Sequence, residues 1–307
     1  MKYYEAIFTI SPFSSDAADL LCALAGEADF ETFEETATGI KGYVQQSLFS
    51  EDTLSEAIAD FPFDGVTISY AIHEADDRDW NEQWEQEGFA PIVIERDKQE
   101  ETDGKCSTII IHDGRHLPDS TLTASYSSLV TSIEIDAKLA FGTGTHETTR
   151  MICATLLDIL NSETESSKLK VLDCGTGTGI LSICALKLGA GEAIGYDIDE
   201  WSVDNARHNA VINQVDDRFT SLLGDASILN KVEGEFDIVL ANINRNILLA
   251  DLPSFRQKMA PGASLILSGF YTADSPMLID KAQSLGLTLI AEKMDNDWAC
   301  LQLSLIL

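Results

Sequence analysis

Residues 171–179 read VLDCGTGTG, and this stretch decides the fold. Its first half is a short apolar run of the kind that forms a buried strand. Gly175 and Gly177 follow in a turn, where glycines let the backbone bend sharply and let a ligand approach closely. The next apolar run ends at Asp197, about 20 residues on, where an acidic side chain accepts hydrogen bonds from ribose hydroxyls. The stretch therefore predicts a nucleoside-binding turn between a strand and a helix.

Two kinds of nucleoside cofactor could bind at this turn. A dinucleotide site needs glycine at the first, third and sixth positions, and the sixth position counted from Gly175 is Ile180. Asp173, two residues before the turn, would repel a pyrophosphate. The same carboxylate would attract the cationic sulfonium and amino group of S-adenosylmethionine, directly or through water. The turn therefore favours a methyltransferase over an NAD-dependent dehydrogenase, and over a purely structural turn.

Strand-like and helix-like segments alternate around this turn from residue 105 to residue 307. Such alternation indicates a parallel, doubly wound α/β sheet. The last two strand-like runs, within residues 288–307, leave no room for a helix between them, so we expect them to pair antiparallel. A parallel sheet that ends in an antiparallel hairpin is typical of the class I, Rossmann-like methyltransferase fold.

The N-terminal part of the chain has a different organisation. Residues 1–75 show the order β-α-β-β-α-β, which predicts a small α+β domain of the ferredoxin-like type. Residues 76–104 are highly charged and carry Trp80 and Trp84 at helical spacing, so we interpret them as a linker. The expected architecture is therefore a ferredoxin-like domain, a linker and a methyltransferase domain over residues 105–307.

Charge is unevenly distributed along the chain. The whole chain has 51 acidic and 20 basic side chains, a net charge of −31, and residues 1–104 alone hold 25 acidic and 5 basic ones. A field of this sign repels nucleic acid and attracts basic partners, although it also serves solubility. We therefore expect no direct nucleic-acid binding, and we consider a basic protein as the substrate.

Composition also bears on metal binding and location. The six cysteines are scattered and none forms a CxxC pair, so we expect reduced cysteines and no metal site. The first residues lack the order of a signal peptide, and no apolar run is long enough to span a membrane. We expect a cytoplasmic protein, and a monomer.

Two further motifs carry polar groups at predicted strand or helix ends. Residues 139–149 read LAFGTGTHETT, which by composition alone predicts a glycine loop followed by a capped helix start. Residues 241–243 read ANI and follow an apolar strand. The amide of Asn242 then lies in the crevice where doubly wound folds bind ligands, and it offers both an acceptor and donors.

In order and spacing, the motifs LAFGTGTHETT, VLDCGTGTGILSICALKLGA, IGYDID, VLANI and LSG resemble the PrmA family. These enzymes methylate ribosomal protein L11 of the large subunit on lysine or N-terminal amines. The resemblance covers about residues 130–307 well. The ferredoxin-like domain and the linker are also the family's architecture, in which the small domain recognises the ribosomal protein.

The resemblance implies roles for residues that match the family's motifs. Thr149, Gly175, Asp197 and Asn242 would contact S-adenosylmethionine, with Asp197 holding the ribose and Asn242 lying beside the transferred methyl group. The loop of residues 139–149 would become part of the cofactor site and an active-site lid. The residues expected at the cofactor besides these four are Phe141, Gly142, Thr143, Asp173 and Gly177.

The catalytic step requires a neutral amine, and it does not require a strong base in the protein. Asn242 would orient the amine, while water carries the proton away. His146 is a candidate proton acceptor, but a lone histidine in a glycine loop is more often a structural hydrogen-bond partner. Catalysis would therefore rest mainly on positioning.

Some features depart from the family. The sequence reads DAK at residues 136–138 where the family has DPG or DPK, and residues 97–128 are longer and less similar. These departures leave open another basic protein or a small amine as the acceptor. A cofactor-binding paralogue without transfer activity is the alternative from another class, against which the intact Asp173, Asp197 and Asn242 argue.

Overall fold

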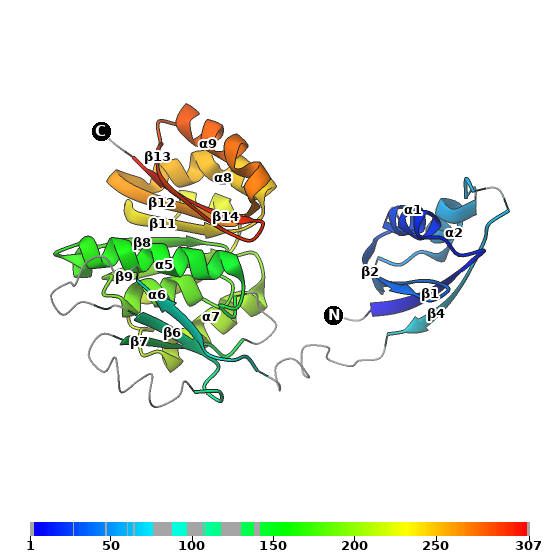
Figure 1. Cartoon of the computed structure of the whole chain (residues 1–307), viewed down its shortest axis with the longest axis horizontal. Helices are drawn as coiled ribbons and strands as arrows, with labels where there is room; N and C mark the ends of the chain where they lie inside the picture. The colour runs from blue at the N-terminus through cyan, green and yellow to red at the C-terminus, as the bar shows by residue number, and fades with distance from the viewer. Residues whose placement is uncertain are drawn as a thin grey trace. The chain divides into compact units, whose positions relative to one another are not determined.

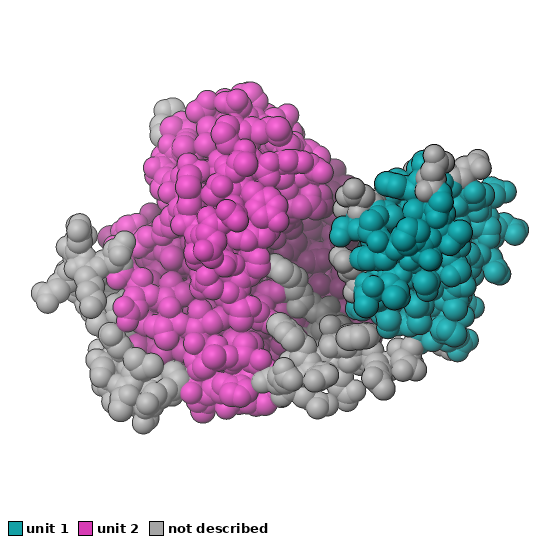
Figure 2. All heavy atoms as spheres, turned by 45° about the vertical axis from the view of Figure 1, so that its right-hand side comes forward, with its two compact units in different colours: residues 1–82 teal, residues 83–307 magenta. Residues whose placement is uncertain are grey.

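The computed structural model describes residues 3–26, 28–46, 48–59, 61–63, 65–75, 88–96, 106, 108–117, 130–137 and 142–305. The chain divides into two compact units, residues 1–82 and residues 83–307 (Figure 1, Figure 2). Each unit has a hydrophobic core of its own. None of the described helices is long and apolar enough to cross a membrane.

Unit 1 is an antiparallel sheet with two helices. Its elements are β1 (Tyr3–Ser11), α1 (Ser15–Gly26), β2 (Phe30–Thr36), β3 (Gly39–Gln45), α2 (Glu51–Ala59) and β4 (Thr67–Glu74). The strand order is β2-β3-β1-β4, and the paired strands run antiparallel. Alternate residues of β1, namely Ala6, Phe8 and Ile10, are buried in a core that includes Leu21 of α1 and Leu54 of α2. Alternation with period two thus places both helices on one face of this sheet.

Unit 2 is built around a seven-stranded sheet. Its elements from the first long helix onward are α5 (Glu147–Ser162), β8 (Lys170–Cys174), α6 (Ile180–Lys187), β9 (Glu192–Asp197), α7 (Glu200–Ile212), β10 (Phe219–Leu223), β11 (Phe236–Asn242), α8 (Arg245–Lys258), β12 (Met259–Tyr271), α9 (Ser275–Ser284), β13 (Thr288–Asp295) and β14 (Trp298–Ser304). The strand order is β10-β9-β8-β11-β12-β14-β13.

The direction of the strands confirms the sheet that the sequence predicts. Strands β10, β9, β8, β11 and β12 pair parallel, whereas β14 pairs antiparallel with both β12 and β13. The final two strands therefore form the expected antiparallel hairpin. This is the α/β methyltransferase arrangement, with the strand order reversing direction on either side of β8.

Helices cover both faces of the large sheet. Along β11, Ile238 and Leu240 belong to the core shared with α5, α6 and α7, whereas Val239 and Ala241 belong to the core shared with α8 and α9. Figure 1 shows α8 and α9 together on one side of unit 2. The central strand is apolar at consecutive positions because each of its faces is buried against helices.

A small second sheet in unit 2 corrects the predicted linker. Strand β5 (Ile92–Glu95) pairs antiparallel with β6 (Thr108–His112), and β6 pairs parallel with β7 (Val130–Glu134). Ile94 is buried in the core that this sheet shares with α5 and α6. Residues 92–95 are flanked by charged residues and therefore fall within the predicted linker. Their own apolar side chains, however, belong to unit 2. Trp80 and Trp84 lie outside the described residues.

The structure describes all six cysteines, and none of them is in a disulfide. Cys153, Cys174, Cys184 and Cys300 are buried, and Cys22 and Cys106 are half-buried. Burial raises the pKa of the Cys300 thiol to about 12, since a thiolate there would be cut off from water. The burial of Cys153, Cys174, Cys184 and Cys300 agrees with the predicted core positions, and the reduced state of the six thiols stays a prediction.

Candidate active site

Several strand ends meet at one edge of the large sheet. Strands β8, β9, β11 and β12 run parallel, so Cys174, Asp197, Asn242 and Tyr271 all end their strands on that edge. Doubly wound sheets bind ligands beyond the carboxyl ends of their strands. The residues predicted from the glycine turn and from the ANI motif are thus brought to one place.

The glycine turn follows β8 and leads into α6. Gly175 has φ +75°, a left-handed conformation that favours glycine, and a Cβ placed on it would lie 2.5 Å from Cγ2 of Ile243. The backbone N–H of Gly177 donates to Oδ2 of Asp197 at 2.9 Å. The turn therefore packs against the loop after β11 on one side and is hydrogen-bonded to the end of β9 on the other.

Asp173 lies beneath the turn and is completely buried. Its Oδ2 accepts hydrogen bonds from the Thr176 hydroxyl at 2.8 Å and from the Ser182 hydroxyl at 2.8 Å. Its Oδ1 is buried without a hydrogen-bond partner. Burial raises the pKa of this carboxyl from 3.8 to about 6, although the Ser182 and Thr176 hydrogen bonds pull it down. Asp173 thus stabilises the glycine turn through these hydrogen bonds. Its contact with the cofactor stays a prediction.

The loop before α5 touches the glycine turn. The hydroxyl of Thr178 donates to the carbonyl oxygen of Gly142 at 2.6 Å. Within this loop, the hydroxyls of Thr143 and Thr145 are 2.8 Å apart. This hydrogen bond joins the two glycine-threonine segments across 36 residues of sequence. Phe141, which the sequence predicts in this site, lies outside the described residues.

His146 caps the first turn of α5. Its Nδ1 accepts a hydrogen bond from the backbone N–H of Thr148 at 3.3 Å and lies 2.9 Å from the Thr148 hydroxyl. Its ring meets that of Trp298 edge to face, with ring centroids 4.6 Å apart. Since the cap occupies Nδ1, the structure gives His146 a structural role, and its catalytic role stays a prediction.

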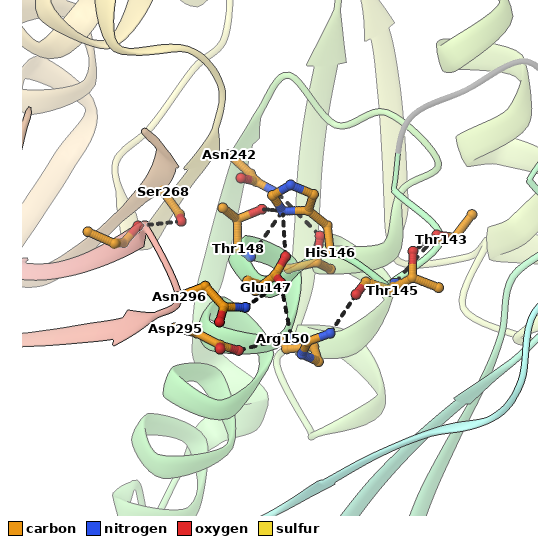
Figure 3. Close-up of polar contacts among 12 residues, drawn as sticks. Thr143, Thr145, His146, Glu147, Thr148, Arg150, Asn242, Ser268, Asp295 and Asn296 are labelled. Carbon is orange, nitrogen blue, oxygen red and sulfur yellow. Dashed lines mark hydrogen bonds and ion pairs between the residues drawn. The ribbon is translucent and has the colours of Figure 1, made fainter. Parts of the chain in front are cut away.

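Side chains from the turn between β13 and β14 hold the start of α5 in place (Figure 3). Arg150 donates to the carbonyl oxygen of Thr145 at 2.6 Å and to Oδ2 of Asp295 at 2.9 Å. Asn296 donates to Oε1 of Glu147 at 2.9 Å. The partly exposed ion pair contributes little by itself. These contacts together fix the helix start relative to the C-terminal hairpin.

Asn242 joins the ANI motif to the HETT motif. Its Nδ2 donates to the hydroxyl of Thr149 at 3.3 Å, and Thr149 itself is completely buried. Its Oδ1 is buried and has no hydrogen-bond partner. A buried amide oxygen left without a partner is costly. Asn242 therefore presents an acceptor that a ligand N–H or O–H could use.

The loop that carries Asn242 depends on a glycine that the sequence analysis did not assign a role. Gly269 has φ +91°, and a Cβ placed on it would lie 2.5 Å from the carbonyl oxygen of Ile243. The backbone N–H of Ile243 donates to the carbonyl oxygen of Ser268 at 3.2 Å. The LSG motif thus supports the ANI loop from the neighbouring strand; the motif itself was visible in the sequence, but its partner was not.

Apolar side chains near the site were also missed by sequence reasoning. Ile198 directly follows Asp197 and is 74% exposed, and the rings of Tyr271 and Trp298 stack 4.4 Å apart at the end of β12. An isoleucine directly after the predicted ribose-binding carboxylate is a signal that could have been read. Nothing in the sequence pairs Tyr271 with Trp298. Within the described ranges, no group of three or more histidine, cysteine or acidic residues could hold a metal ion.

Comparison with known proteins places the chain in a family. The family model described as ribosomal protein L11 methyltransferase (PrmA) matches residues 23–305. A ribosomal protein L11 methyltransferase of Phocaeicola vulgatus is 42% identical over 302 residues, covering 98% of this chain and 99% of that relative. Another from Porphyromonas gingivalis is 38% identical over 307 residues, covering 98% and 97%.

A solved structure supports the same fold. The crystal structure of ribosomal protein L11 methylase from Lactobacillus delbrueckii subsp. bulgaricus superposes with a TM-score of 0.54 at 24% identity, covering 70% of this chain and 98% of that one. Because the family model spans nearly the whole sequence and relatives match it from end to end, this chain belongs to the ribosomal protein L11 methyltransferase family.

Proposed function

We propose that this protein transfers methyl groups from S-adenosylmethionine to lysine or N-terminal amines of ribosomal protein L11. The observation that carries the proposal is the contact between Asn242 and Thr149, which leaves Oδ1 of Asn242 buried and without a partner at the sheet edge. Family membership supplies the acceptor, since the full-length relatives carry this name.

The chain's own residues fit the cofactor. Asp197 accepts hydrogen bonds from the N–H groups of Gly177 and Asp199, and a carboxylate has further lone pairs for two ribose hydroxyls. The exposed side chain of Ile198 offers an apolar surface for an adenine base. Gly175 and Gly177 give close access to backbone atoms, and Gly142 and Thr143 border the same turn.

Catalysis would rest on orientation of the acceptor amine. S-adenosylmethionine supplies a methyl group activated by its sulfonium. Oδ1 of Asn242 would accept a hydrogen bond from the amine N–H and so aim the nitrogen lone pair at that methyl group. A free lysine amine has a pKa of about 10.4, so the amine has to lose a proton first, and desolvation at the sheet edge lowers that pKa. Water carries the proton away.

Recognition of the ribosomal protein is assigned to unit 1. Its order β-α-β-β-α-β and its antiparallel strand order β2-β3-β1-β4 support a ferredoxin-like domain. The acidic excess within residues 1–104 favours a basic partner such as a ribosomal protein. We infer a cytoplasmic enzyme that acts as a monomer.

The test is a transfer assay with labelled S-adenosylmethionine. The acceptor is purified ribosomal protein L11, free and in ribosomes from a strain that lacks the enzyme, and mass spectrometry locates the label. Asp197→Ala serves as the inactive control. Labelled lysine or N-terminal amines, lost in the variant, would establish the activity. Cofactor binding without label on the protein would reject this acceptor while leaving the methyltransferase fold intact.

A further inference from the structure

Two aromatic residues lie on the side of Asn242 away from the glycine turn. Tyr271 ends β12, the neighbour of β11 in the sheet, and pairs in register with Trp298 at the start of β14. The glycine turn and Asp197 belong to β8 and β9, on the other side of β11. If the cofactor occupies the β8 and β9 side, the aromatic pair borders the space left for the acceptor.

The packing of this pair gives Tyr271 a fixed and accessible ring. Tyr271 is 53% exposed, and its ring stacks on that of Trp298 with centroids 4.4 Å apart and an angle of 31°. Trp298 packs against the core under α5 and meets His146 edge to face at 4.6 Å. Trp298 therefore packs against one face of the Tyr271 ring, while the other face of the ring stays open.

The cationic side chains near the pair are already engaged by other groups. The carboxylate of Glu147 lies 3.8 Å from Nδ1 of His146, and Asp295 pairs in register with Trp298. Arg150 is engaged by Asp295 and by the carbonyl oxygen of Thr145, and Arg245 is engaged by Asp274, three residues beyond Tyr271. An exposed aromatic face attracts alkylammonium groups, with an interaction of about 0.5 to 2 kcal/mol.

We propose that the exposed ring of Tyr271 contacts the methylated ammonium group that each transfer leaves on the acceptor, with Trp298 as its positioning residue. The nitrogen lone pair forms the new N–C bond as the C–S bond breaks, so positive charge passes from sulfur to nitrogen. A proton then leaves the nitrogen to water before another transfer. The ring stabilises the charge on nitrogen and retains an alkylated amine for a second methylation. The inference rests on the proposed function, whose acceptor is an amine.

A binding experiment tests the contact without requiring activity. The probes are choline and its neutral isostere 3,3-dimethylbutan-1-ol, added to the full-length protein saturated with S-adenosylhomocysteine. The four tryptophans are followed by their indole N–H resonances, and Trp298→Phe assigns the resonance of Trp298. Choline should shift that resonance at about 5-fold lower concentration than the alcohol, as a cation–π contact predicts. Equal effects of the two probes would overturn the proposal.

Variants at Tyr271 sharpen the test. Tyr271→Phe keeps the ring and should keep the preference for choline, whereas Tyr271→Leu should abolish it. Met277→Leu, which changes a similarly exposed side chain on α9, is the matched control and should behave as the wild type. A Tyr271→Leu protein that still prefers choline would place the contact elsewhere and reject the proposal.

Product analysis links the contact to catalysis. In a time course with ribosomal protein L11, Tyr271→Leu should lower the ratio of multiply to singly methylated amine about 5-fold, and its affinity for S-adenosylhomocysteine should stay unchanged. An unchanged ratio would overturn the role in repeated transfer. If the wild type leaves the ribosomal protein unlabelled, the proposed function fails, and the choline experiment still decides whether Tyr271 binds methylated ammonium.

Discussion

The two halves of the candidate active site are built in different ways. On the β8 and β9 side, the site consists of backbone turns and carboxylates from one stretch of the chain, with Gly177 bonded to Asp197 only 20 residues away. On the β11, β12 and β14 side, it depends on contacts between distant segments, such as the bond between Asn242 and Thr149, which are 93 residues apart. The half proposed to bind the cofactor, called the cofactor half, is mostly local in sequence, and the half proposed to bind the acceptor, called the acceptor half, is assembled by the fold.

Because of this difference, the geometry of each half depends on different features of the chain. A local turn keeps its geometry as long as its glycines and its strand are present. An assembled site needs several elements in register, because a slip of one residue in the pairing of a strand turns every side chain on that strand to the other face of the sheet. Changes in the cofactor half should therefore affect ligand affinity directly, whereas changes in the acceptor half should affect stability and turnover through position.

The largest effect is expected at Asp197. Asp197→Ala removes the carboxylate that would hold the ribose hydroxyls, and hydrogen bonds to a charged group contribute about 1.5 to 3 kcal/mol each. We expect the affinity for S-adenosylhomocysteine to fall about 100-fold, measured by isothermal titration calorimetry. Asp199→Ala is the matched control, since Asp199 accepts from the N–H of Ser202 and caps α7. Its loss should cost about 1 kcal/mol of stability and leave affinity unchanged. Equal affinities of the Asp197→Ala and wild-type proteins would remove Asp197 from the cofactor site.

The next largest effect is expected at Gly269, in the acceptor half. An alanine there would be strained at φ +91° and would place its Cβ 2.5 Å from the carbonyl oxygen of Ile243. We expect Gly269→Ala to lower the free energy of unfolding by about 2 kcal/mol, measured by urea denaturation. Turnover should also fall because the loop that carries Asn242 is displaced. Gly262→Ala, at φ +81° with open space around it, controls for backbone strain alone. Equal losses in the two variants would show that the close approach to Ile243 has no effect.

The same contrast decides how much of the structure could be predicted. The parallel sheet, its final hairpin and the glycine turn follow from short apolar runs and glycine spacing, which are local signals. The sequence also predicts Asn242 as a site residue from its place at a strand end and Thr149 through a motif resemblance. Their contact with each other was not foreseen, because register between a helix start and a strand end has no local signature.

Three features escaped the sequence analysis for related reasons. Strand β5 (Ile92–Glu95) lies between charged residues and is recognisable only by its pairing with β6. Tyr271 and Trp298 meet because β12 and β14 pair antiparallel, which composition does not reveal. The complete burial of Asp173 also had no sequence signal, since a carboxylate before a glycine turn is more often expected in contact with ligand or water.

A third prediction concerns the pH dependence that Asp173 gives the cofactor half. Its pKa is raised from 3.8 to about 6, so the native state holds the proton more tightly than the unfolded state does. The stability that this group contributes is fully present below pH 3.8 and is lost as the pH rises through about 6. Between pH 5 and pH 8, the wild type should lose about 1 to 2 kcal/mol of unfolding free energy relative to Asp173→Asn.

Denaturation of both proteins in urea across this range measures that difference, because all other groups titrate alike in the two proteins. The amide introduced by Asp173→Asn would keep an acceptor oxygen for the Thr176 and Ser182 hydroxyls, so the turn should stay intact. A difference in stability that does not change with pH would mean that Asp173 does not titrate in this range. A difference of opposite sign would mean that the native state favours the ionised carboxylate.

The smallest effect is expected at Thr149, and it tests whether the acceptor half acts by position. Thr149→Val keeps the shape of a completely buried side chain but removes the hydroxyl that accepts from Nδ2 of Asn242. The amide then loses the partner that fixes its orientation, at a cost of about 0.5 to 1.5 kcal/mol, or roughly 2-fold to 12-fold. We expect kcat with ribosomal protein L11 to fall by that factor, whereas Thr149→Ser, which keeps the hydroxyl, should remain near the wild type. A loss of S-adenosylhomocysteine affinity without a loss of kcat would instead support the cofactor contact that the sequence predicts for Thr149, and the start of α5 would then belong to the half that binds the cofactor.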